Sequence, residues 1–428
     1  MANQSITVPS ETQNQVSEQH DSQEKVNWLI PIGLFSCVLL AFFDKISIAA
    51  LFSDEKFQQA LGIDFDPTRL GLLMSAFLFS YGISSMLLSG IGDRFHPTKM
   101  LLCMISSWCI LMIFMGLTHN YKMMVFLRVL LGIAEGPLLA IAYAIIRRTF
   151  PPKMQARATM LWLLGTPLGA ALGFPIALYL LNNFGWQSTF FVMAAFTVPV
   201  WWLVIIGIRH PNLVNRTAQT KNTAGAKLSA EHLAEVKAQK SRLYNNSHFW
   251  IICLFNIAFL VYLWGMNGWL PSYLIKGKSI NLEHAGILSS LPFIAMLFGE
   301  AIGAWLSDRY DRRALVCFVS LLGAVAGLAG VLFLTETYSI IMMMAFSMFM
   351  WGAGAPNIFA LLAKATQKQV SALAGGIFNG LGNLAGAAAP LLMGMLITMT
   401  NTMDSGLLFI VVIGLVGSFL LVPLLKKY

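Results

Sequence analysis

The chain has 428 residues, of which 57% are hydrophobic and only 11% are charged. A soluble domain keeps about a quarter of its residues charged, so this composition excludes an ordinary soluble protein. The net charge of +9 does not indicate a nucleic-acid partner, because the basic residues are spread over short connectors between apolar segments and form no binding stripe.

The first segment, residues 1–26, is polar and rich in Gln, Ser and Glu. It has neither a basic start nor an apolar h-region, so we expect a disordered cytoplasmic tail and no cleaved signal peptide. The apolar segments that follow are each roughly 20 residues long, enough to cross the ~30 Å hydrocarbon core of a bilayer. They predict an all-α membrane protein with 12 transmembrane helices, over residues 28–52, 68–91, 99–118, 123–146, 158–182, 187–208, 248–274, 284–306, 314–334, 338–362, 371–398 and 406–425.

A polar, basic stretch over residues 209–247 separates six of these helices from the other six. It predicts a cytoplasmic central loop, within which Leu228–Leu243 reads as an amphipathic helix on the inner membrane surface. Gly92-Asp93-Arg94 follows the second helix, and Ser307-Asp308-Arg309 follows the eighth, about half a chain length later. This repeat predicts two pseudo-symmetric six-helix bundles, residues 27–208 and 248–428, an architecture typical of transporters.

Lys and Arg are far more frequent in the connectors on the side of the two termini than in those on the other side. Such an asymmetry places both termini in the cytoplasm, and an even number of crossings agrees. We expect a multi-pass protein of a bacterial inner membrane.

Four charged residues lie inside the predicted helices: Asp44 and Lys45 in the first, and Arg128 and Glu135 in the fourth. A lone charge at mid-membrane costs at least ~2.5–3.5 kcal/mol. Two residues of each sign therefore indicate a paired group that faces a polar cavity between the bundles. Fixed cations beside titratable acids are what a proton-coupled carrier of anions needs.

Helical geometry relates these four residues to one another. Arg128 and Glu135 are seven residues apart, so they share one helix face at a vertical spacing of about 10 Å. Adjacent Asp44 and Lys45 cannot share a face, and we expect one to face the cavity and the other a neighbouring helix. Pro137 lacks an N–H and frees a carbonyl near Ile133, which allows either a flexible joint or a static kink.

The helix count, the long central loop and the repeated Asp-Arg loops resemble the major facilitator superfamily. The two loops read Ser89-Gly-Ile-Gly-Asp93-Arg94-Phe-His96-Pro97-Thr98-Lys99 and Ala304-Trp-Leu-Ser-Asp308-Arg309-Tyr-Asp-Arg312-Arg313. Further segments are similar to the anion:cation symporters, which include hexuronate and sugar-acid permeases, sialin and the vesicular glutamate transporters. These segments are Phe43-Asp44-Lys45, Arg128-x-x-x-Gly132-x-x-Glu135-Gly136-Pro137, Phe184-Gly185-Trp186, Trp269-Leu-Pro271-x-Tyr273-Leu274 and Asn379-x-x-Gly-Asn383-x-x-Gly-x-x-x-Pro390.

We predict that Lys45 and Arg128 hold the negative group of the substrate. Lys45 occupies a position at which an arginine is more usual in that family. The positive charge is kept, but the two parallel hydrogen bonds that a guanidinium can form with a carboxylate are lost. Glu135, and secondarily Asp44, would take up and release the proton. The alternative is a static charged network that only stabilises the bundle.

Two further groups of residues have predicted roles. Uncharged side chains would line the rest of the cavity, or would only hydrogen-bond between helices; these are Tyr81, Tyr262, Trp264, Asn267, Asn357, Asn379 and Asn383. The loop residues Asp93, Arg94, Asp308 and Arg309 would gate the cytoplasmic side by pairing in one state and releasing in the other, or would simply anchor their loops.

The leading hypothesis is import of a small organic anion, a carboxylate or sugar acid, by proton symport through alternating access. We expect a monomer that needs no cofactor or metal besides the proton gradient. The competing hypothesis is a proton-driven antiporter that exports an anionic drug or a phosphonate or carboxylate antimicrobial. It draws on Gly165-x-Pro167-x-Gly169, which is partly similar to a motif of drug:proton antiporters, although small residues for close helix packing explain it too. An enzyme is disfavoured, because every histidine lies at or beyond a helix end.

Overall fold

The computed structural model describes residues 26–88, 96–208, 238, 241–310, 312–366 and 371–428. Within these residues, 12 helical spans are long and apolar enough to cross a membrane. Every predicted span is found, with its ends within a few residues of those expected, so the all-α membrane fold is confirmed. The spans are Leu29–Leu51, Pro67–Leu88, Pro97–Leu117, Tyr121–Ile146, Arg157–Phe184, Trp186–Gly207, Ser247–Gly277, Gly286–Leu306, Arg313–Leu332, Thr337–Ala365, Ala374–Thr400 and Met403–Leu424.

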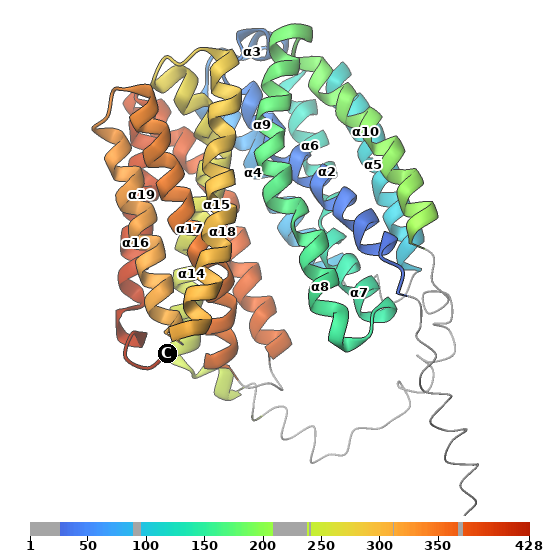
Figure 1. The fold of residues 1–428 in the computed structure, drawn as a ribbon. Coiled ribbons are helices and arrows are strands. Elements are labelled where there is room, and N and C mark those ends of the chain that lie inside the picture. Colours follow the sequence, from blue (N-terminus) through green and yellow to red (C-terminus); the bar gives the residue numbers. More distant parts are fainter. Residues whose placement is uncertain (1–25, 89–95, 209–237, 239–240, 311, 367–370) are drawn as a thin grey trace, which may run out of the picture.

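The individual helices are labelled as in Figure 1. Those of the first half are α2 (Leu29–Leu51), the short α3 (Glu55–Ala60), α4 (Pro67–Leu88), α5 (Pro97–Leu117), α6 (Tyr121–Glu135), α7 (Leu138–Thr149), α8 (Pro152–Leu163), α9 (Gly165–Phe184) and α10 (Trp186–Gly207). Those of the second half are α14 (Ser247–Ser272), α15 (Leu282–Tyr310), α16 (Arg313–Leu332), α17 (Thr337–Ala365), α18 (Ser371–Thr400) and α19 (Met403–Leu420). Two of the spans are therefore each built from two α-helices, α6 with α7 and α8 with α9. Two others end in a short helix of another type, the π-helix Tyr273–Gly277 after α14 and the 3₁₀-helix Val422–Leu424 after α19.

Figure 1 shows the helices in two groups. Helices α2–α10 form an N-terminal bundle on the right, and α14–α19 form a C-terminal bundle on the left. The C-terminus lies at the lower end of the molecule, which we call the terminal face, and α3 lies at the opposite, distal face. Most of the stretch 209–247, with most of its predicted amphipathic helix, lies outside the described residues.

The bundles join chiefly where α4 packs against α18 and α9 packs against α15, with a smaller contact between α2 and α14. In the first pair, helix backbones touch. A Cβ added to Gly71 would lie 2.3 Å from the carbonyl oxygen of Pro390, and one added to Gly394 would lie 2.2 Å from that of Pro67. Only glycine permits so close an approach.

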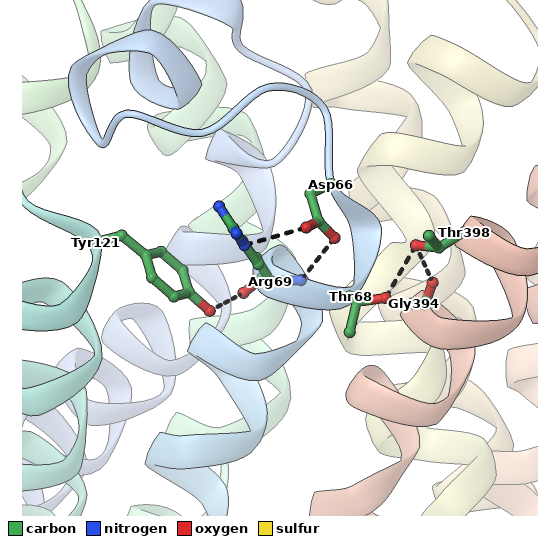
Figure 2. A network of polar contacts seen from close by, with 6 residues as sticks. All are labelled: Asp66, Thr68, Arg69, Tyr121, Gly394 and Thr398. Atoms are coloured by element: carbon green, nitrogen blue, oxygen red, sulfur yellow. Dashed lines mark hydrogen bonds and ion pairs between the residues drawn. The ribbon is translucent and has the colours of Figure 1, made fainter.

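A set of polar contacts ties this junction together near the distal face (Figure 2). The hydroxyls of Thr68 and Thr398 lie 2.9 Å apart and link α4 to α18. Asp66 caps the start of α4 by accepting from the backbone N–H of Arg69 at 3.1 Å, and it pairs with the Arg69 side chain at 3.2 Å. The hydroxyl of Tyr121, at the start of α6, donates to the carbonyl of Arg69 at 2.8 Å. Helix α6 is therefore fastened to the helix that contacts the other bundle.

Within the N-terminal bundle, glycines bring α9 against α2. An added Cβ at Gly165 would meet the backbone nitrogen of Leu39 at 2.8 Å, and one at Gly169 would meet the carbonyl oxygen of Leu39 at 2.6 Å. Close helix packing therefore explains the Gly-x-Pro-x-Gly segment, as the simpler of its two interpretations predicted.

Candidate functional site

The four charged residues of the predicted site are all buried. Asp44 and Lys45 are each 1% exposed, and Arg128 and Glu135 are 0% exposed. Asp44 and Lys45 come from α2, while Arg128 and Glu135 come from α6, and both helices pack beside α4 in the N-terminal bundle. None of the four side chains faces lipid.

Lys45 connects the two charged helices. Its Nζ atom lies 4.0 Å from Oε2 of Glu135, which is an ion pair too long to be a hydrogen bond. The same atom lies 3.9 Å from the ring centre of Tyr81 and 4.4 Å from that of Phe42. The Lys45 ammonium group thus lies against two aromatic rings, while the carboxylate of Glu135 is at the limit of ion-pair distance.

Arg128 is held mainly by backbone and by an aromatic ring. Its Nε donates to the carbonyl of Leu73 at 3.3 Å, and its Nη1 donates to the carbonyl of Asp44 at 3.5 Å. Its guanidinium carbon lies 4.5 Å from the ring centre of Phe77. Charge-assisted hydrogen bonds to carboxylates are normally ~2.7–2.9 Å long, so neither carbonyl contact is a strong one.

Several charged atoms of the site have no hydrogen-bond partner among the described residues. These are both carboxylate oxygens of Asp44, both of Glu135, and Nη2 of Arg128. A buried charged group without partners is costly, and such groups are normally paired or hydrogen-bonded. The site therefore combines two buried cations, one of which has a free donor atom, with two acids whose carboxylate oxygens have no hydrogen-bond donor among the described residues.

The fourth transmembrane span breaks directly after Glu135. Helix α6 ends there, and Pro137 precedes the next helix, so the carbonyl of Ile133 has no helical N–H partner. This free carbonyl was predicted. The structure adds its partner, since the hydroxyl of Ser84 in α4 donates to it at 2.6 Å. An added Cβ at Gly136 would lie 2.8 Å from the Ser84 hydroxyl oxygen, so α4 and α6 touch closely at the break.

The C-terminal bundle holds most of the uncharged candidates. The hydroxyl of Tyr262 pairs with that of Ser347, and the amide of Asn357 donates to the carbonyl of Gly303 at 3.0 Å. Both side chains thus form hydrogen bonds between helices of that bundle, the alternative role considered for them. These contacts do not favour substrate binding by Tyr262 or Asn357.

The other uncharged candidates keep their predicted roles without a direct test. Asn383 donates to the side-chain oxygen of Asn379 at 2.9 Å, so the two do share one face of α18. Trp264 is 5% and Asn267 is 3% exposed, and the side-chain oxygen of Asn267 has no partner among the described residues. Tyr81, by contrast, lies in the charged cluster itself.

The predicted gating residues are only partly described. Asp93 and Arg94 lie outside the described residues, as does the side chain of Asp308. Arg309 is exposed, with its guanidinium carbon 5.6 Å from the ring centre of Trp305. Their gating role stays a prediction.

A well-formed pocket of about 330 Å³ lies elsewhere, between α2, α9 and α10. Its wall is almost wholly apolar and includes Phe43, Gly169 and Pro199, but none of the four charged residues. This pocket and the charged residues therefore lie at different places in the bundle. We assign the candidate site by its chemistry, because an apolar groove on membrane helices is suited to lipid tails.

Two helical bundles with charged groups buried in one of them define a multi-pass membrane transporter. The sequence model of the Major Facilitator Superfamily matches residues 34–390 and 277–427, and the chain belongs to this family. The predicted resemblance is confirmed, as is the prediction that the chain is a transporter and not an enzyme.

Relatives of the chain agree with this assignment. The chain is 24% identical to the probable sulfoacetate transporter SauU of Cupriavidus necator, over 85% of this chain and 86% of that one. It is also 24% identical to the hexuronate transporter of Bacillus subtilis, over 88% of this chain and 89% of that one. The crystal structure of a bacterial homolog to the human lysosomal transporter Spinster has the same fold, with a TM-score of 0.79, 15% identity and coverage of 94% and 97%.

Proposed function

We propose that this protein is a proton-coupled secondary transporter of a small organic anion, a carboxylate or sugar acid. The observation that carries the proposal is the buried cluster of Lys45, Arg128, Asp44 and Glu135, in which cations and acids are close but poorly paired. The names of the two relatives support it, because sulfoacetate and hexuronates are both small organic anions. We further propose symport into the cytoplasm across a bacterial inner membrane, with both termini inside.

The two cations would hold the anionic group of the substrate. Arg128 has an unpartnered Nη2, and a guanidinium can present two parallel donors to one carboxylate. Lys45 adds a point charge without that geometry. Arg128 would therefore fix the orientation of the carboxylate, and Lys45 would contribute attraction.

The two acids would carry the proton. Glu135 lies 4.0 Å from Lys45, so a substrate anion that draws Lys45 away changes the charge beside this carboxyl group. Asp44 has its backbone carbonyl against Arg128 and its carboxylate without a partner. Substrate binding and protonation would thus be linked through the shared cations. Separation of α4 from α18 on one side, and closure on the other, would give alternating access.

Transport into proteoliposomes tests the proposal. Purified protein would be reconstituted, an inward proton gradient imposed, and uptake of glucuronate, galactarate and sulfoacetate measured together with the external pH. Symport predicts accumulation of at least one anion while the outside medium becomes more alkaline. Absence of movement of every organic anion offered, by a protein that remains folded, refutes the proposal.

Glu135→Gln separates substrate movement from coupling. The variant keeps the side-chain size but cannot lose a proton, so we expect exchange of internal for external anion to persist while gradient-driven accumulation is lost. Normal accumulation by the variant contradicts the coupling role of Glu135.

Export of an anionic drug is the competing prediction. The glycine segment that suggested it is accounted for by packing of α9 against α2. The same proteoliposomes distinguish the two directions, because an antiporter would expel internal anion as protons enter.

A further inference from the structure

Two aromatic residues on one face of α4 contact the two cations of the site. Phe77 and Tyr81 are one helical turn apart, and their rings stack with centres 5.9 Å apart and planes 26° apart. Phe77 is 0% exposed and Tyr81 is 9% exposed. Arg128 lies over the first ring, at 4.5 Å, and Lys45 over the second, at 3.9 Å.

These rings are close partners of cations that lack close anions. The ion pair of Lys45 with Glu135 is 4.0 Å long, and the hydrogen bonds of Arg128 to backbone carbonyls are 3.3 and 3.5 Å long. The negative face of an aromatic ring attracts a cation, and more strongly where water is excluded. Phe77 therefore does more than fill space, although it carries no polar atom.

An aromatic ring attracts a cation more weakly than a carboxylate does, so a substrate anion can replace it more easily. A carboxylate in the same position would form a strong pair with Arg128, and a substrate anion would have to break that pair at considerable cost. A ring holds the cation in place and carries no net charge. It can therefore be displaced by a substrate anion, and it can take the cation back afterwards.

We propose that Phe77 and Tyr81 act as temporary partners for Arg128 and Lys45 during the step in which the carrier returns without substrate. This inference rests on the proposed function, since it concerns the same site. In our scheme, the anion takes over the cations from the rings on binding and gives them back on release. Phe77 is thus a positioning residue for Arg128, and it needs no contact with the substrate.

The inference predicts a difference between two modes of transport. In exchange, anion is present on both sides of the membrane and the carrier always crosses loaded, so the rings matter little. In net uptake, the carrier must return empty with its cations held by the rings. Phe77→Leu should therefore lower net uptake roughly tenfold, as expected for loss of a desolvated cation–π contact, while exchange changes by less than about twofold.

Fluorinated phenylalanines at position 77 distinguish the ring face from the ring shape. Stepwise fluorination withdraws electron density from the face and leaves the packing nearly unchanged. Net uptake should fall with each added fluorine while exchange stays constant. This series also covers the case in which the leucine variant fails to fold.

Phe79→Leu is the matched control, because Phe79 lies on the same helix and is only partly buried. It should leave both modes at wild-type levels. The inference is overturned if fluorination leaves net uptake unchanged, or if both modes fall together. Failure of the proposed function is a separate result, because the wild-type protein would then show no exchange of any organic anion.

Discussion

The hydrogen bond from the Ser84 hydroxyl to the Ile133 carbonyl should contribute measurably to the free energy of unfolding. Pro137 cannot supply an N–H to the carbonyl of Ile133, and the Ser84 hydroxyl supplies the missing donor at 2.6 Å. Ser84→Ala leaves that carbonyl without a donor in apolar surroundings. The expected loss of unfolding free energy is about 1 kcal/mol. This lies between the ~0.6 kcal/mol average for hydrogen bonds within membranes and the ~1–3 kcal/mol cost of an unsatisfied buried group.

The assay is unfolding by denaturing detergent in mixed micelles, followed by the loss of helical circular dichroism. Ser80→Ala is the matched control, since the Ser80 hydroxyl donates only to carbonyls of its own helix, those of Ala76 and Phe77, at 2.9 Å each. We expect that control to cost much less than Ser84→Ala.

A double-mutant cycle with Pro137→Ala makes the test specific. The alanine restores a backbone N–H that can bond to the Ile133 carbonyl, so Ser84→Ala should cost less in this background than in the wild type. Equal costs in both backgrounds, or equal costs for Ser84→Ala and Ser80→Ala, would refute the reasoning. Ser84 would then be an ordinary helix-surface serine.

Three further predictions concern the bundle junction and the site. Gly71→Ala places a methyl group 2.3 Å from a carbonyl oxygen of α18, so transport should fall severalfold. Gly82→Ala, on the same helix, meets only a leucine methyl at 3.5 Å, and transport should stay near normal. Cysteines replacing Thr68 and Thr398, whose hydroxyls are 2.9 Å apart, should cross-link on oxidation, with arrest of uptake that a reductant reverses; absence of cross-linking in every condition contradicts the proximity. Arg128→Lys keeps the positive charge but loses the two parallel donors of the guanidinium, so the apparent affinity for the anion should fall by about tenfold or more, with a smaller change in maximal rate. An unchanged affinity would contradict the proposal that Arg128 binds the carboxylate of the substrate.

The fold was predictable because a membrane imposes one requirement on every segment. Backbone groups in the hydrocarbon core must be satisfied internally, so each long apolar run is a helix. The same logic predicted the break at Pro137, since proline removes one donor at a known place. The gap at Leu164 between α8 and α9 was not expected. Pro167 lies three residues further on and cannot supply an N–H to the carbonyl of Leu163, which instead accepts from the Thr166 hydroxyl at 2.8 Å. The reasoning applied to Pro137 holds here too, but it was not used to predict this break.

The site was predictable only in its charged part. Intramembrane charges are so costly that Asp44, Lys45, Arg128 and Glu135 were expected to pair, and the described residues show all four buried with one ion pair among them, Lys45 to Glu135. That the four face a polar cavity between the bundles stays a prediction. Phe77 could not be found in this way, because an aromatic residue on an apolar helix looks the same whether it faces lipid, core or cation.

Polar uncharged residues were ambiguous for a related reason. A single hydrogen bond satisfies Tyr262 or Asn357 inside the C-terminal bundle, and the same residue types can equally line a binding site. Ser84 was not predicted to have a role, because that role depends on which helix packs against the free carbonyl of Ile133. The sequence contains no signal for that pairing.

The helix pairs that join the bundles have an unusual composition. Helix α18, which contacts α4, contains no acidic or basic side chain, and neither does α9, which contacts α15. No ion pair can therefore form across either helix pair, and dissolved salt has no charge pair there to screen. The strength of these two helix contacts should then vary little between dilute buffer and high ionic strength. A marked salt effect on turnover would have to arise elsewhere, at the entrance for the anion or at Lys276, whose Nζ lies 4.5 Å from the ring centre of Phe65 in the other half of the chain.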